Sequence, residues 1–218
     1  MEVNVFDRTT TNSKIISAST YNIVIGLTLL WGFVVNWFMV LNIPVESISH
    51  VNPIIFFIGF FASAFLGIYL FSKSINPLVS FIGYNLVVVP FGLIINLAVS
   101  QYDPNIVLEA IRVTGMVTFV MMLLGSMYPA FLKKISGGLT IALLCVIVVE
   151  LIEIFIFNTH HGILDWIVAI IFCGYIGYDW ARANAIPKTY DNAIDSAAAL
   201  YMDIINLFLR ILRILGRK

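Results

Sequence analysis

Apolar residues gather in six long stretches along the chain, and short polar connectors separate one stretch from the next. A helix needs roughly 20 mostly apolar residues to cross the hydrocarbon core of a bilayer, which is about 30 Å thick. The stretches match that length and lie at residues 21–41, 53–71, 77–99, 106–128, 139–157 and 163–180. They are about twice as long as a membrane-spanning strand and do not alternate between apolar and polar residues. The pattern therefore predicts an all-α membrane protein.

A seventh segment, residues 193–215, is also apolar, but charged side chains interrupt it. With the three- and four-residue spacing of a helix, its polar residues fall close to one stripe. The stripe reads Ala199, Asp203, Asn206, Arg210, Arg213 and Arg217. Two interpretations fit this periodicity: a helix lying on the membrane surface, or a helix whose polar stripe faces the interior of a bundle. The alanine-rich run IDSAAAL favours the second, because small side chains permit close packing of helices.

The positions of lysine and arginine predict the orientation. Arg8 and Lys14 precede the first stretch, and the second, fourth and sixth connectors also carry basic residues, whereas the first, third and fifth carry none. By the positive-inside rule, the N-terminal segment, residues 1–20, and the even-numbered connectors are cytoplasmic. Four basic residues near the end of the chain would be carried outward by a seventh crossing. The side of the membrane on which the C-terminus lies therefore stays open.

Composition narrows the class of protein. Hydrophobic residues make up 61% of the 218 residues and charged residues 11%, against ~45–50% and ~25% in soluble domains. The mean hydropathy of +0.99 is typical of an integral membrane protein. The net charge is zero, so no basic surface indicates nucleic acid. We expect a monomer in the lipid bilayer, and the short connectors favour a bacterial inner membrane.

Two aspartates stand where a membrane helix would be apolar. Asp179 lies in GYDW, at the cytoplasmic end of the sixth stretch in this orientation, and Asp203 lies in LYMDIINLF. A carboxylate at the centre of a bilayer costs ~2.5–3.5 kcal/mol even on the most lenient scale. If the connector between them turns the chain back, the spacing lets the two carboxyl groups meet. Asp179 also has Arg182 as a nearby partner.

The same residues resemble a known signature. IGYDW, followed after a short basic connector by AAALYMDIINLFLRILRILG, closely resembles the C-terminal signature of the Bax inhibitor-1 family, whose bacterial members are called YetJ-like. Tyr178-Asp179 and the run from Leu200 to Phe208 match that signature position for position. IVLEAIRVTGMVTF resembles the fourth helix of the family, with Glu109 at the position of its acid.

The resemblance implies a seven-helix bundle in which six helices surround a central C-terminal helix. It also implies a pH-sensitive calcium leak channel gated by a hydrogen-bonded pair of aspartates, here Asp179 and Asp203. Bacterial members place a basic residue near the cytoplasmic end of the second helix, where it can latch onto the first aspartate. This chain has Lys73 there. A lysine lacks the planar, bidentate fork of an arginine, so the sequence does not decide whether Lys73 forms such a latch.

The expected aspartate pair would couple protons to calcium. Two carboxyl groups in one desolvated site cannot both ionise at low cost, so they titrate as a unit and share one proton over some range of pH. Their oxygens are also ligands of the kind that calcium prefers. We therefore expect protons and Ca²⁺ to compete for Asp179 and Asp203, with Asn206, one turn away, as a hydrogen-bonding neighbour. Calcium is the bound or transported ion, and no cofactor is expected.

Further charged residues lie inside the predicted stretches. Glu109 and Arg112 are three residues apart and either pair with each other or belong to an ion pathway. Glu150 and Glu153 share a helix face near the outer end of the fifth stretch. The alternatives there are an access point for ions and simple solvation at the membrane interface. The adjacent histidines of NTHHG lack a third spaced ligand and are poor support for zinc.

Two other functions fit parts of the sequence. Intramembrane aspartyl proteases place a Tyr-Asp on one helix and an Asp on the next, where two carboxylates activate water. GYDW fits the first of these motifs, but LYM precedes Asp203 where the second motif needs Gly-x-Gly. We therefore expect no enzyme. The other alternative is a non-conducting interaction or stress-response protein, in which the aspartates only fix the packing of helices.

Overall fold

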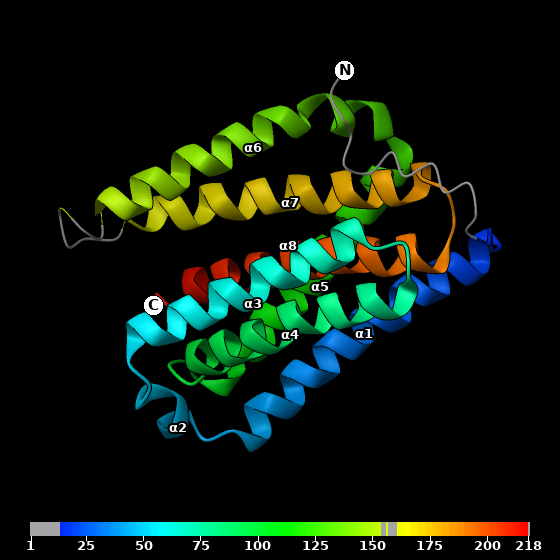
Figure 1. The fold of residues 1–218 in the computed structure, drawn as a ribbon. Coiled ribbons are helices and arrows are strands. Elements are labelled where there is room, and N and C mark those ends of the chain that lie inside the picture. Colours follow the sequence, from blue (N-terminus) through cyan, green and yellow to red (C-terminus); the bar gives the residue numbers. More distant parts are fainter. Residues whose placement is uncertain (1–13, 154–155, 157–160, 218) are drawn as a thin grey trace. The chain divides into compact units, whose positions relative to one another are not determined.

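The computed structural model describes residues 14–153, 156 and 161–217. The described residues form eight α-helices and no strand (Figure 1). The helices are α1 (Ala18–Asn42), α2 (Val45–Ser49), α3 (Pro53–Lys73), α4 (Pro77–Val99), α5 (Pro104–Met127), α6 (Pro129–Ile152), α7 (Gly162–Ala185) and α8 (Tyr190–Leu215). The all-α prediction is confirmed.

Six of the described helices, α1 and α3 to α7, are long and apolar enough to cross a membrane. The helix α8 has a similar length but carries five charged side chains. The predicted number of seven helices was wrong, because the first connector forms the additional helix α2. This helix has only five residues, begins after Pro44 and buries one side chain, Ile48. It is too short to span a bilayer at 1.5 Å per residue.

One local device starts three of the membrane helices. A proline occupies the first helical position of α3, α4 and α5, and an asparagine or aspartate precedes it. The side-chain oxygen of that residue accepts the backbone N–H two positions later, at 2.8–3.0 Å. The proline lacks an N–H, so it removes one of the unpaired donors at the helix start. These Asn-Pro and Asp-Pro pairs fix the beginnings of the helices from local chemistry alone.

The helix α6 begins ten residues before the predicted start at residue 139. Only Tyr128 separates it from α5, and Pro129 occupies its first position. Lys133 and Lys134, expected in a connector, are therefore helical and exposed. Lysine is a good helix former, and its long stem lets the charge reach polar surroundings. The predicted end of this stretch, residue 157, lies outside the described residues.

The chain divides into two compact units, and α8 contributes to both. The first unit holds residues up to Gln101 together with Ala185–Tyr201, and the second holds Tyr102–Asn184 and the residues from Met202 onward. The expectation of a single transmembrane domain stays a prediction, as does the cytoplasmic segment 1–20, most of which lies outside the described residues.

The first unit is built around α4 and the first half of α8. The helices α3 and α4 approach most closely where glycines meet: a Cβ atom added to Gly67 would lie 2.5 Å from the carbonyl oxygen of Gly83. Tyr84 and Tyr201 are fully buried, with ring centroids 5.4 Å apart and planes nearly perpendicular. The Asn36 amide donates to the Tyr201 hydroxyl at 2.5 Å. Aromatic rings and small residues therefore make this core.

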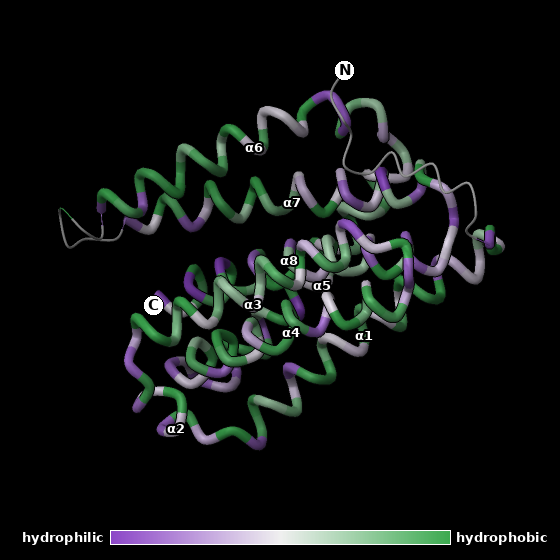
Figure 2. Tube along the Cα trace, in the orientation of Figure 1, coloured by the Kyte–Doolittle hydropathy of each residue, from purple (hydrophilic) through white to green (hydrophobic). Residues whose placement is uncertain are grey.

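The second unit contains α5, α6, α7 and the second half of α8. Gly125 on α5 lies against Gly177 on α7, where an added Cβ would be 2.5 Å from the Gly177 carbonyl oxygen. The Trp180 indole on α7 donates to the Ser126 hydroxyl at 2.8 Å. Apolar residues follow most of α6 (Figure 2), and many of its large ones are exposed. An exposed apolar helix of this length fits contact with lipid.

The close contact at Gly67 predicts a loss of stability on adding one methyl group. Gly67→Ala should lower the thermal midpoint of the purified protein, since overpacking against a backbone oxygen costs about 1–3 kcal/mol. Gly59→Ala, in the same helix with nothing within 4 Å of the added carbon, is the matched control and should leave the midpoint unchanged or slightly raised. Equal midpoints for the two variants would contradict the packing described here.

Candidate functional site

Asp179 and Asp203 come together in the second unit. Asp179 lies in the last two turns of α7, and Asp203 lies in the middle of α8. Their carboxyl groups lie close enough to interact with each other, and only 8% of Asp203 is exposed. Two carboxyl groups in one desolvated site cannot both be ionised at low cost.

The two acids have different surroundings. An Arg182 nitrogen (Nη1) lies 3.4 Å from Asp179 Oδ1, and both side chains are largely buried, with 15% and 13% exposed. The second oxygen of Asp203, Oδ2, is buried and has no hydrogen-bond partner among the described residues. A neighbouring guanidinium stabilises a negative charge. Asp179 therefore has a counter-charge on its own helix.

The four residues expected to support the pair have other partners or are exposed. The Asn206 amide donates to the backbone oxygen of Met202 at 2.8 Å, on its own helix. Lys73 is exposed in the last turn of α3, in the first unit. Arg112 lies 3.9 Å from Glu109 on α5, and both side chains are more than half exposed. An exposed pair of this kind contributes little to stability.

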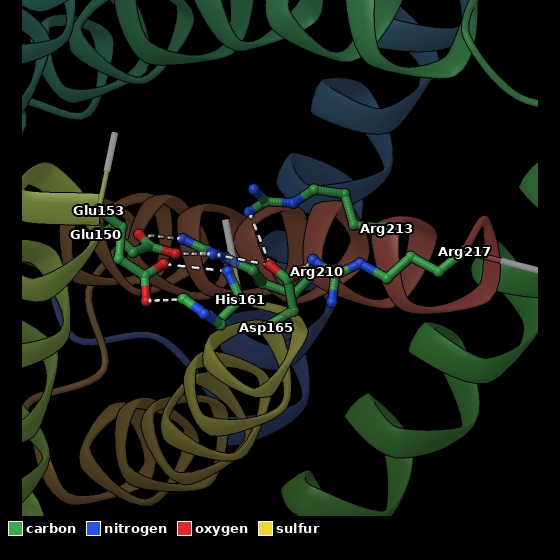
Figure 3. A network of polar contacts seen from close by, with 7 residues as sticks. All are labelled: Glu150, Glu153, His161, Asp165, Arg210, Arg213 and Arg217. Atoms are coloured by element: carbon green, nitrogen blue, oxygen red, sulfur yellow. Dashed lines mark hydrogen bonds and ion pairs between the residues drawn. The ribbon is translucent and has the colours of Figure 1, made fainter. Parts of the chain in front are cut away.

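Glu150 and Glu153 take part in a second polar cluster of the same unit (Figure 3). Both terminal nitrogens of the Arg210 guanidinium bond the Glu150 carboxylate, Nη2 to Oε2 at 2.9 Å and Nη1 to Oε1. Glu153 binds His161, with Nδ1 and Oε1 2.7 Å apart. A two-point contact between a guanidinium and a carboxylate is the strongest geometry available to an ion pair. Glu150 is thus bound to a cation of the chain itself.

Asp165 is the centre of this cluster, and the sequence did not single it out. Its side chain has no exposed surface and lies within 3.0 Å of Arg210, 3.3 Å of Arg213 and 2.6 Å of Arg217. The sequence did hold a signal: four basic residues near the end of α8 needed counter-charges if the helix was to pack inside the protein. Asp165 stands in the first turn of α7, fourteen residues before Asp179 and close to the same helix face.

These contacts set the direction of the second half of α8. Asp203 meets the end of α7 that leads into the α7–α8 connector, whereas Arg210 meets the beginning of α7. The second half of α8 therefore runs antiparallel to α7, whose two acids are about 21 Å apart at 1.5 Å per residue. Leu200, Leu207 and Leu212 are fully buried. The alternative of a helix lying on the membrane surface is excluded, and the basic residues are held by acids of α6 and α7.

Metal ligands are few around both clusters. Within the described residues, no three side chains of His, Cys, Asp or Glu gather in a group that could hold a metal ion. A calcium site at Asp179 and Asp203 would have two carboxylates, and Ca²⁺ takes six to eight oxygen ligands. Backbone carbonyls or water would have to complete it.

The fold and the site define an all-helical integral membrane protein, whose described residues include six helices long and apolar enough to cross a membrane and buried acids on the last two helices. The chain belongs to the Bax inhibitor-1 family. The sequence model of that family, described as "Inhibitor of apoptosis-promoting Bax1", matches residues 13–218.

Individual relatives agree with the assignment. The chain is 31% identical to an uncharacterized protein of Helicobacter pylori over 166 residues, which cover 74% of this chain and 70% of the relative. It is 32% identical to Bax inhibitor 1 of Schizosaccharomyces pombe, over 57% of this chain and 47% of that protein. It is 33% identical to an uncharacterized membrane protein of Vibrio cholerae, over 52% and 50% of the two chains.

The central place of Asp165 predicts that its charge is needed for a stable fold. Asp165→Asn should leave Arg213 and Arg217 without their counter-charge. Breaking a buried pair costs about 3–5 kcal/mol, and the partial exposure of the arginines reduces this to about 2 kcal/mol, or roughly 4–8 °C in thermal midpoint. Asp103→Asn is the control, because asparagine caps a helix as well as aspartate does. A midpoint for Asp165→Asn equal to that of the control would contradict this role.

Proposed function

We propose that the chain is a pH-sensitive calcium leak channel, in which the protonation of Asp179 and Asp203 sets the position of α8. The observation that carries the proposal is the close approach of these two largely buried carboxyl groups on successive helices. We further propose that it acts as a monomer in a bacterial inner membrane, with a cytoplasmic N-terminus and with α8 as the central helix. Membership of the Bax inhibitor-1 family supports this proposal.

The mechanism follows from the proton between the two acids. While one proton is shared, the hydrogen bond holds the second half of α8 against α7. When the proton leaves, two like charges face each other in a site of low dielectric and repel. Ca²⁺ can then replace the proton as the positive charge between the carboxylates, since both compete for the same oxygens. The occupant of this site, a proton or an ion, thus determines the separation of the two helices.

Arg182 gives the pair an asymmetry that suits a switch. Its guanidinium lies beside Asp179 and not beside Asp203, so one carboxylate can stay ionised while the other gains and loses the proton. The proposal assigns no catalytic step to the pair. Ca²⁺ flux in liposomes containing only the purified protein separates a leak channel from a non-conducting interaction protein.

Asp203→Asn should fix the channel in one state. The asparagine amide donates a hydrogen bond to Asp179 without a titratable proton, so the variant mimics the protonated pair at every pH. We expect its Ca²⁺ flux into liposomes to be constant between about pH 5 and pH 8, at the level that the wild type shows at the acidic limit. Asp103→Asn is the control and should keep the wild-type pH profile. A titrating profile in Asp203→Asn would refute the proposed sensor.

Arg182→Gln should shift the pH dependence of the Ca²⁺ flux without abolishing it. The substitution removes the positive charge that stabilises an ionised Asp179, so the pair becomes harder to ionise. The midpoint of the flux profile is expected to move to higher pH by about one unit. Arg182→Lys retains the charge and should return the midpoint most of the way. If Arg182→Gln and the wild type share one midpoint, the arginine does not act on the pair.

A further inference from the structure

Arg210 lies on the same stripe of α8 as Asp203. Seven residues, about two helical turns, separate them, so the two side chains leave the helix on one face. Asp203 contacts α7 near its end, and Arg210 contacts α7 near its beginning, at Asp165. An ion that follows this face of α8 away from the aspartate pair therefore meets a guanidinium.

The Arg210 guanidinium is held from two helices. It binds Glu150 of α6 through its two terminal nitrogens, Nη1 and Nη2, and Asp165 of α7 through Nη1 at 3.0 Å. Only 15% of the Arg210 and Glu150 side chains is exposed, and none of Asp165. Buried charge pairs with two-point geometry hold their partners in one place, since each charge alone would be costly in this environment.

We propose that Arg210 forms a second closure point of the leak pathway, where its guanidinium, clamped between Glu150 and Asp165, bars cations at the end of α8 remote from Asp179. This inference rests on the leak function proposed above. For Ca²⁺ to pass, the second half of α8 must part from α6 and break the pair between Arg210 and Glu150. The closure is steric, because the clamped guanidinium joins α8 to Glu150 of α6 and Asp165 of α7.

The neighbouring arginines lower the free-energy cost of separating Arg210 from Asp165. Asp165 is also bound by Arg213 and Arg217, so it keeps two counter-charges when Arg210 leaves. Only Glu150 loses its cation, and a passing Ca²⁺ can compensate that charge. A network in which Asp165 had Arg210 as its single partner would leave two uncompensated acids on opening. Because three arginines bind Asp165, Arg210 can leave and return while Asp165 stays paired.

The first test measures Ca²⁺ leak into liposomes at neutral pH. Arg210→Gln and Glu150→Gln each remove one side of the clamp and should raise the initial leak about tenfold, by increasing the population of a minor open state. Arg210→Lys keeps the charge with fewer hydrogen bonds and should fall between the wild type and Arg210→Gln. The controls are Lys134→Gln and Glu46→Gln, which remove exposed charges, one on α6 and one on α2.

The second test follows the helices themselves and does not need conduction. Spin labels at Leu151→Cys on α6 and Ile214→Cys on α8, in a chain without its native Cys145 and Cys173, report the distance between the helices. The clamp variants should broaden this distance distribution toward longer values, whereas the controls should not.

The two measurements separate the two proposals. Leak and distance that both stay at wild-type values in Arg210→Gln and Glu150→Gln would overturn the closure point. A raised leak without a change in distance would also overturn it, since the helices would not have parted. A distance change in the absence of any Ca²⁺ flux, in the wild type and in every variant, would uphold the clamp and refute the leak channel. Glu150→Gln keeps the test valid if Arg210→Gln fails to fold.

Discussion

The cost of an uncompensated charge inside the protein governs the packing of α8. This helix carries five charged side chains, and an isolated charge in a low-dielectric environment costs several kcal/mol even after relaxation. The second half of α8 meets this constraint through contacts with α6 and α7: Asp203 lies against Asp179, and Arg210 binds Glu150 and Asp165. The register of α8 against α7 depends on these contacts, because a shift of one turn would leave both charges without partners.

The face of α7 that carries the two acids is apolar between them. Val168, Phe172 and Ile176 lie at helical spacing between Asp165 and Asp179, and all three are buried. The charged contacts of α7 on this face are therefore confined to two positions, Asp165 near one end of the helix and Asp179 near the other. Asp179 meets Asp203, and Asp165 binds three arginines.

The relation to the Bax inhibitor-1 family gives this arrangement a context. Bacterial members place a basic residue of the second helix where it can latch onto the first aspartate, and the sequence left undecided whether Lys73 does so. In the second unit the basic partner of Asp179 is Arg182, one turn away on the same helix. A partner on the same helix moves with Asp179, so it stays beside that carboxyl group wherever the helix lies.

The sequence by itself determined the features that depend on local chemistry. The hydrophobic stretches predicted the membrane helices, the Asn-Pro and Asp-Pro pairs start three of them, and the spacing of Asp179 and Asp203 allowed their contact. The early start of α6 and the short helix α2 were missed, because hydropathy marks where lipid begins and not where a helix begins. Only the tertiary structure decided that α8 is buried and antiparallel to α7, and that Asp165 binds three arginines. Those pairings join residues more than forty positions apart, and helical periodicity gives the face of a residue but not the helix that it will meet.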